Sequence, residues 1–290
     1  HPPPNPNMLK TEIDPPIDRE AVVRRLAATY DDGRYTDAWE RVQEYQSYLE
    51  YTNRNPEASA YAVASALGIP RGRVRPWMDD NSAPDPVRAI EIADDRGWLD
   101  LCWAEPPFTG LNVIVAWIFS GGSITEQTKV PLLAVDEETH PVAITALNTI
   151  GLTDVRTTRV HEDNRAMELI PTTDASILGR LLVALGAPLG VKTSSPQLSL
   201  PGYLATAPQT IRLNFARTYV WNRGTLRPDR PNTPVQIREK RSPQYRHEIQ
   251  ALFNSLVPDA TRGKSATHRL STEAALQLHQ PPTLGGGVPK

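Results

Sequence analysis

The chain has 290 residues, enough for two or three domains, and 39% of them are hydrophobic, so it can bury real cores. No apolar run reaches the roughly 18 residues of a membrane span, and a single cysteine, Cys102, excludes an internal disulfide. The first ten residues hold no apolar segment of the signal-peptide kind, so a cytoplasmic location is expected.

The formal net charge of −2 hides a strong asymmetry along the chain. Residues 1–110 hold 12 Lys and Arg against 19 Asp and Glu, whereas residues 209–290 hold 13 against 5. A basic C-terminal third predicts a partner with fixed negative charge, with nucleic acid as the first candidate. A merely solvated basic surface is the alternative, because charge asymmetry alone is a weak signal.

Residues 1–17 are proline-rich and predicted to be a disordered tail, and residues 18–105 are predicted to form a helical domain. Within it, SAYAVASALGIPRGRVRPWMDD (59–80) resembles a helix-turn-helix, with Gly68 as the turn glycine. We expect Arg71, Arg73 and Arg75 to point outward at the start of the recognition helix, and Pro76 to kink or shorten that helix. The alternative is a helical bundle with an arginine-bearing edge. The other helices of this domain are expected over 18–32, 36–52 and 84–99.

After a predicted linker at residues 105–110, the pattern changes to helices alternating with pairs of strands. The same order then returns from residue 208, so residues 110–207 and 208–280 are predicted to be two halves of one duplicated αββαββ domain of the α+β class. Residues 281–290 are predicted to be a second tail. The first half is expected to hold a helix over 111–120, strands within 125–136, a helix over 140–151, strands within 155–171 and a helix over 174–188. The second half is expected to hold a helix over 208–222, strands within 225–241, a helix over 242–258 and strands within 260–280.

The first helix of each half ends in a glycine turn. LNVIVAWIFSGGSI (111–124) and FARTYVWNRGT (215–225) resemble the two signature helices of the LAGLIDADG homing endonuclease family, and GVK (190–192) and Leu200-Pro201 stand between them in the family's order. The resemblance covers about residues 110–280. It implies two packed helices, each followed by a saddle-shaped sheet that contacts duplex DNA.

The same resemblance implies one metal-binding acid just before the glycine at each helix end. Gly121 and Arg223 stand at these two positions, and neither side chain can bind Mg²⁺. We therefore expect no catalytic residue, no metal and no cofactor, and Arg223 is expected to attract a phosphate instead. Taken alone, the Gly121-Gly122 pair would also suit an ordinary helix end.

Strand residues of the family alternate between the core and the DNA groove. In VQIREK, Val235 and Ile237 are expected to face the core while Gln236, Arg238 and Lys240 face the groove. A solvated outer sheet face is the alternative. The other residues expected to contact DNA are Thr125, Gln127 and Lys129, with Arg156 or Arg159 extending their face, and Arg227, Arg262 and Lys264, with His268 of the same parity.

These observations predict a sequence-specific duplex DNA-binding protein, expected to be a transcriptional regulator that acts as a monomer with internal pseudo-two-fold symmetry. One alternative is an active endonuclease with a displaced metal-binding acid, either Glu126 or Asp229. The other is an RNA- or protein-binding module similar to a maturase.

Overall fold

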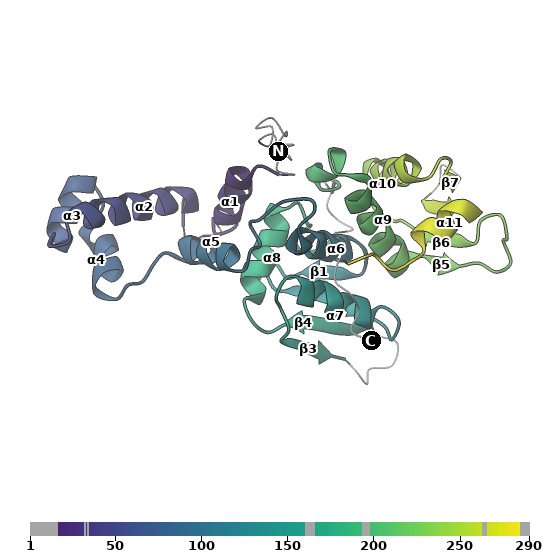
Figure 1. The fold of residues 1–290 in the computed structure, drawn as a ribbon, viewed down its shortest axis with the longest axis horizontal. Helices are drawn as coiled ribbons and strands as arrows, with labels where there is room; N and C mark the ends of the chain where they lie inside the picture. Colours follow the sequence, from purple (N-terminus) through teal and green to yellow (C-terminus); the bar gives the residue numbers. More distant parts are fainter. Residues whose placement is uncertain are drawn as a thin grey trace, which may run out of the picture.

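A computed structural model describes residues 17–31, 33, 35–159, 166–192, 198–262 and 266–284. Within these residues the fold is mixed α+β, and the strands form two four-stranded antiparallel sheets. The molecule is elongated, with a group of N-terminal helices at one end and the second sheet at the other (Figure 1). Of the two predicted tails, residues 1–16 and 285–290 lie outside the described residues.

The predicted N-terminal domain is helical. Asp18, Asp37 and Ser59 cap three of its helices, because each side chain accepts a hydrogen bond from a backbone N–H of the first turn. The helices are α1 (Arg19–Ala28), α2 (Ala38–Arg54), α3 (Ala60–Leu67), α4 (Arg71–Asp79) and α5 (Asp85–Asp95).

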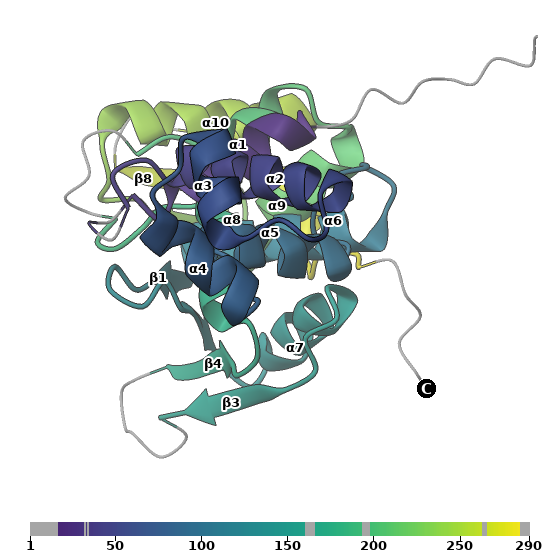
Figure 2. The same cartoon turned by 90° about the vertical axis from the view of Figure 1, so that its left-hand side faces the viewer.

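Helices α3 and α4 are joined by a tight turn that begins at Gly68, whose φ of 67° lies in the left-handed region. Their apolar sides pack on α2, where the rings of Tyr45, Tyr48 and Trp77 contact one another at centroid distances of 5.3–5.5 Å. Pro76 does not end α4, which continues to Asp79, so the expectation that the proline shortens the helix is wrong. Seen along the long axis of the molecule, α3 and α4 lie in front of the rest of the chain (Figure 2).

Helices α1 and α5 connect this group to the remainder of the chain through α8 (Ala175–Ala184). The guanidinium of Arg180 donates to the backbone oxygen of Thr29 and lies 3.7 Å from the ring centroid of Tyr30. Arg96 donates to Asp174 Oδ2 at 2.7 Å. The hydrophobic core of the larger part of the chain therefore includes residues of α1 such as Val22 and Leu26.

After α5, the order helix, two strands, helix, two strands, helix occurs twice. The strand orders of the two sheets, β1-β2-β4-β3 and β5-β6-β8-β7, are equivalent. The first half contains α6 (Pro106–Ser120), β1 (Gly122–Ile124), β2 (Pro131–Val135), α7 (His140–Thr149), β3 (Val155–Thr158), β4 (Met167–Pro171) and α8. The second half, preceded by the 3-10 helix η1 (Gly202–Ala205), contains α9 (Gln209–Arg223), β5 (Thr225–Leu226), β6 (Val235–Arg238), α10 (Pro243–Leu256), β7 (Thr261–Arg262), β8 (Thr267–Leu270) and α11 (Thr272–Leu278).

The start of α6 corrects one sequence-based boundary. Residues 105–110 were expected to form a linker, but Pro106 and Pro107 occupy the first positions of α6. Proline is favoured there because the first turn of a helix has no intrahelical acceptor for its N–H groups. At the other end of the chain, Thr283 exchanges two hydrogen bonds with Asn214 of α9, at 2.8 and 2.9 Å, so the described part of the predicted second tail is fixed on α9.

Helices α6 and α9 pack side by side in the centre of the two halves. Asn112 donates to the backbone oxygen of Ile211 at 3.0 Å near their beginnings, and Asn222 donates to Ser120 Oγ at 2.9 Å near their ends. The two helices therefore run in the same direction, and their C-terminal ends lie together. The uninterrupted apolar sequence of α6 is explained by this position, because nearly every side chain from Phe108 to Ser120 is buried.

Candidate functional site

A cleft of about 470 Å³ opens where the C-terminal ends of α6 and α9 meet the two sheets. Its wall draws on both halves of the chain: Ser123 and the segment after α8 come from the first, and α9 and β6 from the second. The lining residues are Ser123, Gly190, Val191, Lys192, Arg223, Arg238, Glu239, Lys240 and Arg241. Among these nine residues the charged side chains are five cations and one carboxylate, a composition suited to an anionic ligand.

Gly121 and Arg223 lie at the paired helix ends, as expected for two equivalent positions. A Cβ atom at Gly121 would lie 3.5 Å from the Asn222 side chain, which is ordinary contact, so packing does not by itself require a glycine there. Arg223 donates to the backbone oxygen of Arg238 at 2.7 Å and lies 3.7 Å from Glu239. The guanidinium of Arg223 is thus fixed beside the cleft and partly neutralised.

Glu239 and Arg241 form a buried polar network beneath the cleft. Glu239 is 1% exposed; it accepts from the Tyr219 hydroxyl, and one of its oxygens lies 3.5 Å from Arg241 Nη1. Arg241 also donates to the Tyr245 hydroxyl at 3.2 Å and to the backbone oxygen of Phe119 at 2.6 Å. The network ties β6 and α10 to the end of α6, and it compensates the burial of both charges.

Lys192 brings a further positive group to the same cleft. Its ammonium donates to the backbone oxygens of Ile118, at 2.6 Å, and of Gly122 at the end of α6. Burial, together with the nearby Arg241 and Arg223 guanidiniums, lowers the pKa of Lys192 to about 7. Although GVK is part of the resemblance, Lys192 was not among the predicted contact residues. Only the folded chain brings it to the helix ends.

The solvent face of the second sheet continues from the cleft. Arg238 is exposed as predicted, and Lys240 is exposed just beyond the end of β6, with no carboxylate partner for either among the described residues. Gln236 shares the strand face of Arg238 but is only 9% exposed, because its neighbours cover it. Arg227 approaches Gln236 Oε1 at 3.5 Å, although its stronger contacts are with Asp229.

The alternation expected for the last strands is partly wrong. His268 lies opposite Ile237 and is 2% exposed, so it faces the core. Arg269 lies opposite Gln236 and therefore shares the solvent face with it, and its backbone is also in register with that of Arg262. The sequence reasoning missed Arg269. Of the other predicted contacts here, only the backbone of Arg262 is described, and Lys264 lies outside the described residues.

The first sheet does not present the residues expected of it. Thr125, Gln127 and Lys129 were predicted to alternate along a strand, but they lie in the turn between β1 and β2. The Thr125 hydroxyl is bonded to Thr128 at 2.6 Å, and only Gln127 of the three is exposed. Lys129 is 8% exposed and donates to the backbone oxygen of Glu126, so it is not available to a partner.

Neither candidate for a displaced metal-binding acid lies in the wall of the cleft. Asp229 is exposed and paired with Arg227 at 3.0 Å, which lowers the pKa of its carboxyl. Glu126 lies in the β1–β2 turn, with its side chain against Gly190. Among the described residues, no group of three or more His, Cys, Asp or Glu side chains could hold a metal ion.

The predicted recognition helix α4 carries two exposed arginines rather than three. Arg71 and Arg75 are exposed, and Arg75 lies 3.4 Å from Asp79 in a surface ion pair of small energy. Arg73 was expected to point outward, but it pairs with Glu44 of α2 at 2.6 Å, and Glu44 also binds Arg41.

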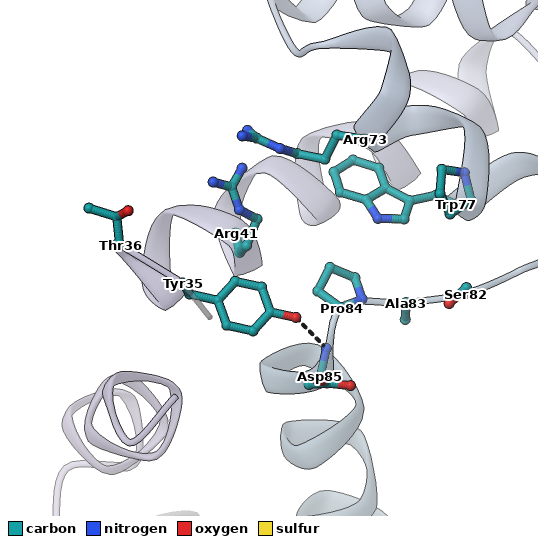
Figure 3. Close-up of a pocket in the computed structure, with 10 residues that line it drawn as sticks. Tyr35, Thr36, Arg41, Arg73, Trp77, Ser82, Ala83, Pro84 and Asp85 are labelled. Atoms are coloured by element: carbon teal, nitrogen blue, oxygen red, sulfur yellow. Dashed lines mark hydrogen bonds between the residues drawn. The ribbon is translucent and has the colours of Figure 1, made fainter. Parts of the chain in front are cut away.

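Arg41 and Arg73 lie side by side at a polar pocket of about 440 Å³ that Trp77 also lines (Figure 3). The hydroxyl of Tyr35, on the opposite side of this pocket, accepts a hydrogen bond from the backbone N–H of Asp85 at 3.3 Å. Because Arg73 is paired with Glu44, it attaches α4 to α2.

In the part of the chain that the structure describes, no helix is both long enough and apolar enough to cross a membrane. Comparison of the chain with protein-family models, curated proteins and solved structures finds no significant match.

Proposed function

We propose that the chain is a sequence-specific duplex DNA-binding protein built on a scaffold similar to the LAGLIDADG homing endonucleases, and that it regulates transcription rather than cutting DNA. One observation carries the proposal: two parallel packed helices, each followed by an equivalent antiparallel sheet, end in a cleft lined by cations.

Electrostatics favour a polyanion as the ligand of this cleft. Lys192, Arg238 and Lys240 have no carboxylate partner among the described residues, and Arg223 has only a long contact to Glu239. Duplex DNA has a phosphate on each strand at every step, so cations along one face that neutralise phosphates release the counterions condensed on the DNA, and this release favours binding. Phosphate contacts of this kind position the protein, and side chains on a neighbouring strand face can then reach base edges.

A binding role is favoured over hydrolysis because the two helix ends lack metal ligands. Hydrolysis with divalent metal needs carboxylate or similar oxygen ligands at the reacting phosphate. Gly121 supplies no side chain, and the guanidinium of Arg223 would repel Mg²⁺. Glu239 is the only carboxylate in the wall of the cleft, and it is already bound by Tyr219 and Arg241.

Helix α4 is a second contact element in this proposal. Arg71 and Arg75 lie in its first half, where the recognition helix of a helix-turn-helix contacts the major groove. The two repeats supply an internal pseudo-two-fold relation, so a monomer can contact both halves of a site.

Selection of bound fragments from a random duplex DNA library tests the proposal, performed once in EDTA and once in Mg²⁺. The expected result is an enriched motif that is bound in both conditions and cut in neither. Lys240→Ala should weaken binding to the selected duplex, whereas Arg54→Ala, at an exposed position at the end of α2, should leave it unchanged.

Three other outcomes would each reject the proposal in a different way. Cleavage in Mg²⁺ would mean that the chain is a nuclease with a displaced acid, and Glu126→Gln and Asp229→Asn would then identify which carboxylate is needed. Failure to enrich any duplex, with retention of structured RNA, would favour an RNA-binding module. Binding of neither nucleic acid would remove the DNA interpretation of the basic cleft altogether.

A further inference from the structure

The two sheets can be compared position by position, because their strand orders are equivalent and the core-facing residues fix the side of each strand. Gly122 is the first residue of β1, and Gly224 ends α9 directly before β5. Counting from these glycines, Ser123 corresponds to Thr225. Ser123 is paired with Leu132, and Thr225 with Gln236, so Leu132 corresponds to Gln236.

The same counting extends across the solvent face of each sheet. Ala134 lies opposite Glu168 in the first sheet, as Arg238 lies opposite Thr267 in the second. Ile170 lies opposite Arg156 in the first sheet, as Arg269 lies opposite Arg262 in the second. The solvent faces therefore carry these corresponding pairs: Leu132 and Gln236, Ala134 and Arg238, Ile170 and Arg269, Glu168 and Thr267, Arg156 and Arg262.

The central positions of the two faces differ in chemical class. The first sheet has leucine, alanine and isoleucine where the second has glutamine and two arginines. Glu168 on the first face is paired with Arg159 at 2.7 Å, so these two opposite charges compensate each other. Apolar side chains can contact a thymine methyl group, but they cannot accept or donate the hydrogen bonds that distinguish base pairs in the major groove.

We propose that DNA sequence is read on one side only: the second sheet contacts base edges in one half of the site, and the first sheet contributes surface without base-specific hydrogen bonds. This inference rests on the proposed DNA-binding function. It assigns Arg269, together with Arg238, as a specificity-determining residue. The bound site is accordingly asymmetric, with one half of defined sequence and one half that tolerates substitution.

Arg269 has the position that this role requires. It lies on β8, an inner strand of the second sheet, in register with Gln236 on one side and Arg262 on the other. Its side chain is half-buried, and its Nε atom has no hydrogen-bond partner among the described residues. A guanidinium on this face can donate two hydrogen bonds to guanine O6 and N7, the commonest base-specific contact in the major groove.

The experiment uses the full chain and duplex selected from a random library, with the information content of each half of the motif measured. The expected motif is one-sided. Arg269→Ile and Arg238→Ala, which place the residues of the first sheet in the second, should each weaken binding to the selected duplex by about 5- to 150-fold and relax the defined half. Arg156→Ala, at an exposed position of the first sheet, should leave the information content of both halves unchanged, whereas Arg54→Ala, outside both sheets at the end of α2, should change neither property.

A second variant separates specificity from folding and from charge. Arg269→Lys keeps the positive charge but loses the planar fork, so it should keep binding to unselected duplex while losing preference for the selected one. A motif with two equally defined halves, or a loss of sequence preference on Arg156→Ala as large as that on Arg238→Ala, would overturn the inference and leave the proposed function intact. If no duplex is bound at all, the proposed function itself fails, and the two results cannot be confused.

Discussion

Glu239→Gln tests the buried network that holds the cleft together. The carboxylate is 1% exposed and lies 3.5 Å from Arg241 Nη1, and Arg241 is itself 5% exposed. Replacing it with an amide leaves the Arg241 guanidinium buried without a counter-charge. Loss of one partner of a buried ion pair costs about 3–5 kcal/mol, and the hydrogen bond from Tyr219 that an amide oxygen can retain offsets about 1 kcal/mol of that.

The expected loss in the free energy of unfolding is therefore about 2–4 kcal/mol. For a chain of this size each kcal/mol lowers Tm by about 2–4 °C, so thermal unfolding followed by circular dichroism should show a decrease of at least about 4 °C. Glu137→Gln removes an exposed carboxylate that has no hydrogen-bond partner among the described residues, and it should change stability by less than about 0.5 kcal/mol. Equal, small effects of the two variants would refute the reasoning, because Glu239 would then not compensate the charge of Arg241.

Three further predictions concern the salt dependence of DNA affinity, the pH dependence of stability and the packing around a glycine. If Arg238, Lys240 and Arg269 each neutralise one phosphate, the logarithm of DNA affinity should fall with the logarithm of salt concentration with a slope of about −2.7, and Lys240→Ala should reduce that slope by about 1, as measured by fluorescence anisotropy; a flat salt dependence would contradict it. The pKa of Lys192 is lowered to about 7, so between that pH and its ordinary pKa the unfolded chain binds more protons than the folded one, and the free energy of unfolding should rise with pH across this window. Lys192→Met should remove the contribution of Lys192 to this rise in the free energy of unfolding, as measured by urea unfolding at a series of pH values. Identical pH profiles of the variant and the unchanged chain would show that the Lys192 ammonium is not desolvated. Gly179→Ala should destabilise the chain by about 1–3 kcal/mol, because a Cβ atom there would lie 1.7 Å from the backbone oxygen of Lys129, whereas Gly72→Ala in α4, with open space around it, should stabilise by about 0.5–1 kcal/mol.

The sequence predicts most of the helices and the repeated order of elements, because these depend on local periodicity. The apolar run from Leu111 to Phe119 is a helix as expected, and it is buried on all sides between sheet, neighbouring helices and α9. The beginning of that helix is less predictable from composition. Proline is typical of linkers, yet Pro106 and Pro107 begin α6, since proline is equally suited to the first turn of a helix.

Residues on strand faces are harder to predict, since alternation shows which residues share a face only within one strand. Across a hairpin, the face depends on the register, and the pairing of Arg262 with Arg269 joins an even-numbered residue to an odd-numbered one. The prediction assumed that even-numbered residues, such as Arg262, continue to face the groove after the turn. It therefore placed His268 on the wrong face and missed Arg269. In the first half the same method fails differently, because β1 ends at Ile124 and the residues from Thr125 onward form a turn.

Contacts between distant segments have no signature in the sequence at all. Arg73 has the spacing of an outward-facing recognition residue, but Glu44, 29 residues earlier, binds it to α2. Lys192 similarly reaches the end of α6, more than 70 residues away, through the backbone oxygen of Ile118. Residue type and spacing therefore indicate which side chains could contact a ligand, whereas their availability depends on partners that only the folded chain supplies.

At the cleft, residue types in the sequence and tertiary contacts of the fold together indicate which ligand can bind. The sequence places Gly121 and Arg223 at the ends of two equivalent helices, and this alone argues against a metal site. The fold adds Lys192 to the same ends, together with Arg241. The charge of Arg241 is compensated by Glu239, and its guanidinium also donates to the Tyr219 hydroxyl. Positive charge that would repel a metal ion attracts a phosphate at the same place. In the proposed function, the packed helices therefore position cations for a phosphate at the ends where Gly121 and Arg223 supply no metal ligand.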